Sequence, residues 1–282
     1  AGAEIADMEY IQFHPTALFT GKENPLFLIS EAVRGFGAHV VNDDGKRFLF
    51  KYDIRGELAT RDMVSNAISK ELQLSGKDHV YLDCRHLDAR KFYDHFPVIA
   101  AHCNELGIKP EKDLIPVVPA AHYQCGGIKV DQNGVTNIKN LYAIGECART
   151  GLHGKNRLAS NSLLEALVFA HQASENVDRT IAAFVFSSKI LIPKFPKAEL
   201  ATDYHAFEIL KKELQKLVTS FYTSEERDAD LAFEKIKALH DNAISLIETY
   251  EITIPYIEFS NMIAASMLIL KHCKAAANKQ MC

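Results

Sequence analysis

The 282-residue sequence lacks the features that would place it in a membrane, around a metal ion or on a nucleic acid. Its longest largely apolar run, residues 262–270, is too short to span a bilayer. Its six cysteines form no CxxC pair and have no metal-ligand spacing, which predicts reduced thiols in a cytoplasmic protein. The net charge of −4 comes from interspersed acids and bases, so no basic surface is expected. These absences leave an ordinary globular chain, long enough for two domains.

Motifs of several enzyme classes are also missing. The sequence has no GxSxG, no HExxH and no P-loop motif. It therefore predicts no nucleophile elbow, no zinc-protease helix and no loop that binds the phosphates of a nucleoside triphosphate. It has no GxGxxG dinucleotide fingerprint either. Because the chain begins without Met and enters strand-like sequence at once, we expect it to be a fragment that lacks a beginning.

Glycine disappears in the last third of the chain, and this change divides the sequence. Residues 203–277 contain no Gly and one Pro, and their apolar periodicity predicts three long helices at 203–221, 225–249 and 256–277. The earlier part mixes short strands with short helices and Gly-rich turns. It predicts strands at 80–84 and 140–144, a helix at 61–74 and a hairpin at 126–138, among others. The expected fold class is therefore α+β, followed by an α-helical bundle.

The most informative window is residues 145–165, GECARTGLHGKNRLASNSLLE. A predicted strand ends there, a loop of small residues carries His153 and Arg157, and Ser162 with Glu165 forms a predicted capping box at a helix start. The first N–H groups of a helix and its dipole favour an anion, such as a phosphate or the charge on a reduced flavin. An ordinary strand-turn-helix explains the pattern as well, but it does not explain two large polar side chains in such a loop.

Four short segments concentrate functional side chains at the ends of predicted elements. They carry His14 beside a proline, Glu31 with Arg34, Arg61 at a helix start, and His122 before two glycines. Each has an ordinary structural explanation, such as a surface ion pair for Glu31 and Arg34. A cation at a helix N-terminus opposes the dipole, however, so Arg61 is misplaced unless another group needs it. Together the segments offer arginines and histidines suited to gripping a dicarboxylate.

Several of these segments together resemble one family. QFHPTALF, LISEAVRG, GELATRD, PAAHYQCGGIKVD, LYAIGE and TGLHGKNRLASNSLLEALVF are similar to motifs of the succinate dehydrogenase/fumarate reductase flavoproteins. The resemblance runs from residue 1 to about 180. Within the family it is strongest to the aspartate-oxidising branch, because the succinate and fumarate enzymes carry Met in place of Cys125 and Gly in place of Ala159. It implies four parts: the end of a first FAD-binding segment at 1–12, a capping domain at 13–116, a returning, Rossmann-like FAD-binding segment at 117–180, and a helical domain at 181–282.

The resemblance also implies roles for particular residues. Arg157 and His122 would hold one substrate carboxylate, and His14 with Ser30 the other. Arg61 would donate and accept the proton, with Glu31 and Arg34 as its relay. The remaining implied residues are Glu31 and Ser160 at the substrate, and Glu146, Ser162 and Leu163 at FAD.

The implied reaction is hydride transfer from L-aspartate to FAD, which gives iminoaspartate for NAD biosynthesis, with oxygen or fumarate as electron acceptor. Implied partners are L-aspartate or another C4 dicarboxylate and quinolinate synthase. Two alternatives stay open: a fumarate reductase or succinate dehydrogenase flavoprotein subunit, and an inactive truncated interaction module. Two departures stand out: Phe36 replaces the Glu usual in this family, and the Gly-rich half that receives the FAD pyrophosphate is absent, so we expect the chain alone to be inactive.

Overall fold

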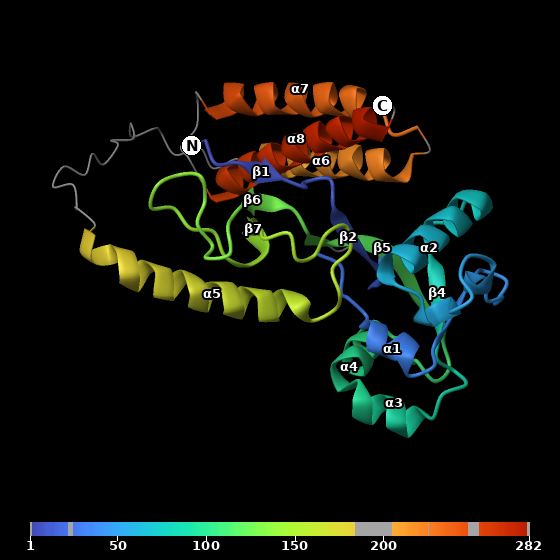
Figure 1. The fold of residues 1–282 in the computed structure, drawn as a ribbon. Coiled ribbons are helices and arrows are strands. Elements are labelled where there is room, and N and C mark those ends of the chain that lie inside the picture. The colour runs from blue at the N-terminus through green and yellow to red at the C-terminus, as the bar shows by residue number, and fades with distance from the viewer. Residues whose placement is uncertain (1, 22–24, 184–204, 225, 248–253, 281–282) are drawn as a thin grey trace. The chain divides into compact units, whose positions relative to one another are not determined.

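The computed structural model describes residues 2–21, 25–183, 205–224, 226–247 and 254–280 (Figure 1). The chain forms two compact units. Unit 1 comprises residues 1–10, 125–154 and 159–282, and unit 2 comprises residues 11–124 and 155–158. Because each unit contains segments distant in sequence, tertiary contacts rather than chain order define them. The domain boundaries expected from sequence, at 12/13, 116/117 and 180/181, stay predictions.

Unit 2 is built on a four-stranded antiparallel sheet in the order β2-β5-β4-β3. Its strands are β2 (Ile11–Leu18), β3 (His39–Val41), β4 (Val80–Asp83) and β5 (Ile115–Gln124). Its helices are α1 (Glu31–Gly35), α2 (Arg61–Ser75), α3 (Ala89–His95) and α4 (Pro97–Glu105), with short 3₁₀ turns at Leu49–Lys51 and Gly56–Leu58.

The local signals explain where several of these elements begin and end. The helix expected at 61–74 is α2, whose N-cap residue Thr60 makes no side-chain capping bond and whose C-cap Gly76 is in the left-handed conformation. The helical stretch between residues 89 and 105 is divided at Phe96 into α3 and α4. The cause is Pro97, which disfavours the helical conformation for the residue before it.

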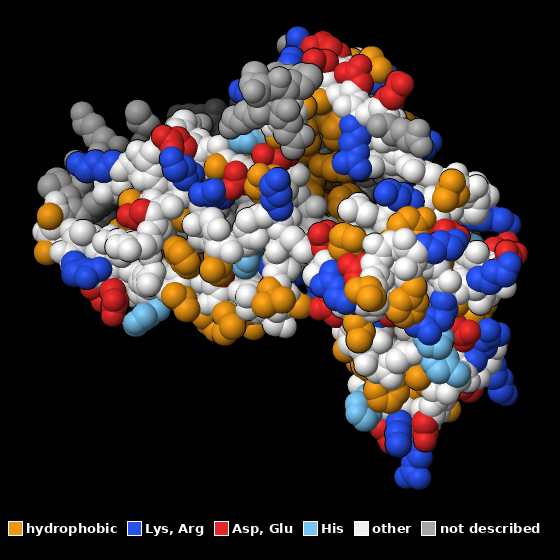
Figure 2. All heavy atoms as spheres, turned by 45° about the vertical axis from the view of Figure 1, so that its right-hand side comes forward, with side chains coloured by type: hydrophobic (Ala, Val, Ile, Leu, Met, Phe, Trp, Pro, Cys, Tyr) orange, Lys and Arg blue, Asp and Glu red, His pale blue; other side chains and the backbone are white. Residues whose placement is uncertain are grey.

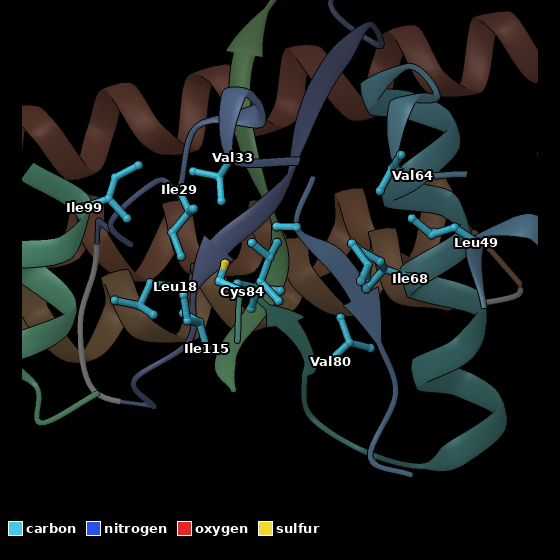
Figure 3. Close-up of a cluster of buried hydrophobic side chains, with 14 of the residues drawn as sticks. Leu18, Ile29, Val33, Leu49, Val64, Ile68, Val80, Cys84, Ile99 and Ile115 are labelled. Atoms are coloured by element: carbon cyan, nitrogen blue, oxygen red, sulfur yellow. The ribbon is translucent and has the colours of Figure 1, made fainter. Parts of the chain in front are cut away.

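The core of unit 2 lies between the sheet and its helices. Figure 3 shows buried side chains of β2, β4, β5, α1, α2 and the residues before α1 in one cluster, which includes Leu18, Ile29 and Ile115. All three are fully buried. A cluster of this kind stabilises the unit through the removal of apolar surface from water.

Two irregularities interrupt the pairing of β2 with β5. Gln12 pairs with Tyr123 and Phe13 with Ala121, which leaves His122 as the extra residue of a bulge. Between the pairs His14–Ala120 and Ala17–Val118 the register shifts again, at the position of two prolines, Pro15 and Pro119. Proline cannot donate to a ladder and is tolerated inside a sheet only at such places. Bulges redirect side chains, and these two lie where the candidate residues gather.

Unit 1 contains a three-stranded sheet in the order β1-β6-β7, formed by Ile5–Ala6, Gly127–Lys129 and Ala148–Arg149. A Cβ atom on Gly126 would lie 2.1 Å from the carbonyl oxygen of Asp7, so only glycine fits this close approach. The predicted strand 140–144 is wrong: a single bridge joins Tyr142 to Val135, and a 3₁₀ turn follows at Gly145–Cys147. The predicted hairpin over 126–138 is also wrong, because β6 pairs with β1 and β7 instead.

Helix α5 (Asn161–Thr180) begins one residue before the predicted capping box, and the box does not form. Ser160 is the N-cap, in the left-handed conformation, and its side chain makes no capping bond. Glu165 instead accepts hydrogen bonds from Thr150 and His153, the latter at 2.7 Å, with both members of the His–Glu pair buried. A buried partner satisfies the carboxylate better than a half-exposed backbone N–H at the helix start. A short 3₁₀ turn, Ile181–Ala183, follows α5.

Three long helices follow in the same unit: α6 (His205–Thr223), α7 (Ala229–Ile247) and α8 (Ile254–Gln280). They lie side by side in Figure 1 and share a core that includes Phe207, Leu214 and Phe259. This arrangement confirms the α+β class with a helical C-terminal region. Within the described ranges, every helix is too short or too polar to cross a bilayer. Figure 2 shows acidic and basic side chains intermingled on the face that it draws.

Candidate active site

His14 and His122 face each other at the bulged ladder of unit 2. His14 follows the first irregularity on β2, and His122 is the extra residue on β5, so both side chains are turned to the same place. Their rings meet edge to face, with centroids 5.3 Å apart. The bulge therefore explains how two histidines separated by more than a hundred residues share one site.

His14 is electrically neutral in this environment. Burial, followed by the charge of Arg61, lowers its pKa to about 3. The backbone N–H of Thr16 donates to Nδ1 of His14 at 3.3 Å, so the ring proton sits on Nε2. A neutral imidazole of this tautomer offers one N–H donor to an acceptor such as a carboxylate.

Arg157 is held by two aromatic neighbours. Its guanidinium carbon lies 4.4 Å from the centre of the Tyr123 ring, a cation–π contact. Its Nη2 is 3.2 Å from Nε2 of His122. Since a guanidinium only donates, this nitrogen of His122 accepts, and the ring proton is on Nδ1. Arg157 is buried, so its charge is held in place for an anionic ligand.

Arg61 forms a bidentate pair with Glu31. Its Nε lies 2.8 Å and its Nη2 3.2 Å from the two carboxylate oxygens. Burial raises the pKa of Glu31, but the hydrogen bonds and charge of Arg61 and the charge of Arg34 outweigh it, and the pKa lies below its usual value. This pair accounts for a cation at the start of α2, where the helix dipole alone disfavours it.

Arg34 is the second arginine that lies beside Glu31. Its Nη2 lies 3.9 Å from Glu31, and its Nη1 donates to the backbone carbonyl of Glu57. Burial lowers the pKa of Arg34, because a charged guanidinium is disfavoured away from water. Phe36 does not share these contacts and packs on two rings of the core. Its ring centroid lies 5.1 Å from that of His95 and 5.5 Å from that of Phe96.

Ser30 lies beside this group as the N-cap of α1. Its Oγ accepts from the backbone N–H of Ala32 at 3.2 Å, which leaves its hydroxyl proton available for another acceptor. The six predicted residues of unit 2 other than Ser30 lie close to one another through the contacts given above. They are His14, Glu31, Arg34, Arg61, His122 and Arg157.

The remaining predicted residues belong to unit 1. Glu146 is exposed on the 3₁₀ turn that lies against α5, and Ser160, Ser162 and Leu163 form the start of that helix. The side chain of Ser160 does not cap the helix. The first turn of a twenty-residue helix and a nearby carboxylate therefore occur together in this unit.

Two residues of the site were missed from sequence. Gln12 is buried and hydrogen-bonds Arg61 Nη1 at 2.9 Å, and Asn156 accepts from Gln12 at 2.7 Å. Gln12 lies two residues before His14 on the same strand. Because alternate residues of a strand face the same side, the sequence could have placed Gln12 beside His14. Asn156 had no signal, because its partners are distant in sequence.

Comparison with known proteins identifies related sequences. Residues 1–163 match a family model described as an FAD binding domain. The chain is 37% identical over 278 residues to an L-aspartate oxidase of Acinetobacter baylyi, covering 96% of this chain and 50% of that protein. It is 54% identical over 177 residues to L-aspartate oxidase 1 of Ralstonia nicotianae, covering 63% of this chain and 33% of that one. The chain thus spans half or less of the length of these relatives.

Solved structures show the same fold. A quinol fumarate reductase of E. coli superposes with a TM-score of 0.70 at 29% identity, covering 97% of this chain and 51% of that one. The likeness extends across both units.

Proposed function

Because the chain belongs to the FAD-binding domain family that its residues 1–163 match, we propose that the protein is the flavoenzyme that oxidises L-aspartate to iminoaspartate. FAD is the cofactor of this family. The main support is that unit 2 brings together Arg157, His122, His14 and the Arg61–Glu31 pair. These side chains offer hydrogen-bond donors for two carboxylates and one group that can accept a proton. The relatives from Acinetobacter and Ralstonia support aspartate as the dicarboxylate.

Residues of unit 1 fit a flavin. The first turn of α5 provides backbone N–H groups that the Ser160 side chain does not cap, and these suit a ring that becomes negative on reduction. Glu146, exposed on the adjoining turn, suits the hydroxyl groups of the ribityl chain. Ser162 and Leu163 would offer their N–H groups to the ring. FAD, when bound, accepts the hydride that the substrate loses.

The two carboxylates of the substrate would be held separately. Arg157, with His122, would bind one through charge-assisted hydrogen bonds. His14, through Nε2–H, and Ser30, through its hydroxyl, would bind the other. Since His14 is neutral, it adds a donor without adding a second fixed charge, so Arg157 dominates the electrostatic attraction. Ser160 would support this binding.

Arg61 would take the proton that leaves as the hydride goes to FAD. An arginine serves as a base only where its surroundings make its proton mobile. Glu31 accepts two of its N–H groups, and Arg34 lies on the other side of Glu31, which provides a continuous row of exchangeable protons. The product, iminoaspartate, would pass to quinolinate synthase for NAD biosynthesis, with oxygen or fumarate reoxidising the flavin.

One alternative has its own support. The structural likeness to a quinol fumarate reductase favours a fumarate or succinate enzyme acting on the same kind of dicarboxylate. Cys125 and Ala159 argue against it, because those enzymes carry Met and Gly there.

The test is anaerobic reduction of the flavin in the protein expressed from its whole reading frame. We expect L-aspartate to bleach the visible flavin band, and oxygen or fumarate to restore it. Succinate in place of aspartate is the matched comparison. If succinate bleaches the flavin and aspartate does not, the alternative function is the correct one.

A further inference from the structure

We propose that Gln12 is a positioning residue that holds Arg61 and the segment Lys155–Leu158 in one fixed arrangement, so that proton transfer and carboxylate binding depend on the same side chain. This inference rests on the proposed function, because it assigns Gln12 to the reaction that Arg61 and Arg157 would carry out. Gln12 has 3% of its surface exposed, so water does not replace the bonds described below.

The orientation of the Gln12 amide is determined by its partners. Its Oε1 accepts from Nη1 of Arg61 at 2.9 Å, and a guanidinium has no acceptor. Its Nε2 donates to Oδ1 of Asn156 at 2.7 Å and to the backbone carbonyl of Arg157 at 2.6 Å. Both amide protons are thereby used. A flipped amide would lose all three bonds and bring oxygen against two acceptors.

Asn156 closes these bonds into a ring. Its Nδ2 donates to Oδ1 of Asp62 at 2.9 Å, and Asp62 follows Arg61 directly at the start of α2. The circuit therefore runs from Arg61 to Gln12, Asn156 and Asp62, and back to Arg61 through one peptide bond. Two side-chain amides thus tie the segment Lys155–Leu158 to the first turn of α2.

The ring also aims the guanidinium of Arg157. Gln12 holds its backbone carbonyl, while Tyr123 and His122 hold its guanidinium. A long side chain with both ends held loses little further freedom when a carboxylate binds. Gln12 therefore bonds both the Arg61 guanidinium and the backbone of Arg157. Asn156 bonds Gln12 and Asp62 but not the Arg61 guanidinium.

The experiment compares Gln12→Met, Gln12→Glu and Asn156→Ala in the FAD-loaded protein from the whole reading frame. Gln12→Met keeps the shape and removes all three bonds. We expect kcat to fall about 100-fold, the scale that a misplacement near 1 Å produces, and KM to rise as well. Asn156→Ala should raise KM and lower kcat much less than Gln12→Met does, because the Gln12–Arg61 bond remains.

Gln12→Glu adds a second carboxylate beside Arg61, in addition to Glu31. A nearby negative charge favours the protonated guanidinium, so the acidic limb of the kcat–pH profile should move to higher pH. Gln12→Met should not move that limb. Gln132→Glu, an identical charge change at an exposed turn residue of unit 1, is the matched control and should behave as the wild type.

Malonate separates this inference from the proposed function, because a dicarboxylate with a single methylene group cannot be dehydrogenated. Its affinity is read from the shift of the flavin spectrum, and we expect it to fall about tenfold in both Gln12 variants. If the wild type does not oxidise aspartate, the proposed function fails, and the malonate series still supports or overturns the role of Gln12. Gln12→Met with wild-type kcat, KM and malonate affinity overturns the inference. Asn156→Ala with the same loss of kcat as Gln12→Met does so too, since a merely structural ring predicts equal effects.

Discussion

Arg61 occupies a position that helix formation by itself disfavours. It is the first residue of α2, where the dipole repels a cation, and it is retained there by a bidentate pair with Glu31 and a bond to Gln12. We predict that Arg61→Lys abolishes turnover and leaves dicarboxylate affinity largely intact. Lys keeps the charge but loses the planar guanidinium, which bonds Glu31 through two nitrogens and Gln12 through the third.

Arg157→Leu is the contrasting variant for that prediction. It removes the buried cation of the proposed carboxylate site, so binding should weaken by about 2–5 kcal/mol. Steady-state kinetics measures the turnover of both variants, and titration with succinate measures their dicarboxylate affinity. Near-normal turnover of Arg61→Lys would remove Arg61 from the proton-transfer role.

His14 provides a prediction about pH. Burial and the neighbouring cations lower its pKa to about 3, whereas the unfolded chain has a pKa of 6.5. Between these values the unfolded state binds a proton that the folded state does not, so stability falls as pH falls through this window. The loss is at most about 1.4 kcal/mol per pH unit.

Urea unfolding between about pH 5 and 7 measures this dependence. In His14→Gln the slope should be smaller than in the wild type, and in His171→Gln, whose side chain is 73% exposed, it should be unchanged. An NMR titration of His14 near 6.5 in the folded protein would contradict the prediction.

At the scale of single elements, α5 contributes to two His–Glu pairs in opposite surroundings. His153 and Glu165 are buried and 2.7 Å apart, while His171 and Glu175 are exposed and 3.3 Å apart. We predict that Glu165→Ala lowers the free energy of unfolding by about 3 kcal/mol, because His153 and Thr150 lose a buried acceptor.

Glu175→Ala is the matched control and should cost about 0.3–0.5 kcal/mol, as exposed pairs one helical turn apart do. Chemical denaturation of the two variants decides. Equal losses would show that the Glu165 pair contributes no more than a surface contact.

Elements also show where sequence patterns succeed. Helix α2 was predicted within one residue, because Thr60 and Gly76 are strong boundary signals and its apolar face is periodic. The expected strand 140–144 failed because a short apolar run forms a strand only if another strand pairs with it. In unit 1, β6 pairs with β1 and β7 instead.

At the scale of the whole molecule, FAD binding depends on more than α5 and Glu146. The pyrophosphate of a dinucleotide is held by a Gly-rich loop at a helix start, and this sequence contains no GxGxxG. We predict that the 282-residue chain alone binds FAD weakly or not at all.

The measurement is a visible spectrum of the purified chain after gel filtration with added FAD. The protein from the whole reading frame is the control and should retain the flavin. A stoichiometric flavin band on the 282-residue chain would show that the residues of unit 1 suffice.

The sequence by itself determined the family, the cofactor, the α+β class with its helical C-terminal region, and the identity of most polar side chains of the candidate site. These depend on local motifs and periodicity, which a linear pattern contains. Only the tertiary structure decided that a bulge brings His122 to His14, that Glu165 bonds His153 and Thr150 rather than capping α5, and that Gln12 joins Arg61 to Asn156. Each of these depends on a partner chosen by packing between distant segments, and no local preference of the chain specifies such a partner.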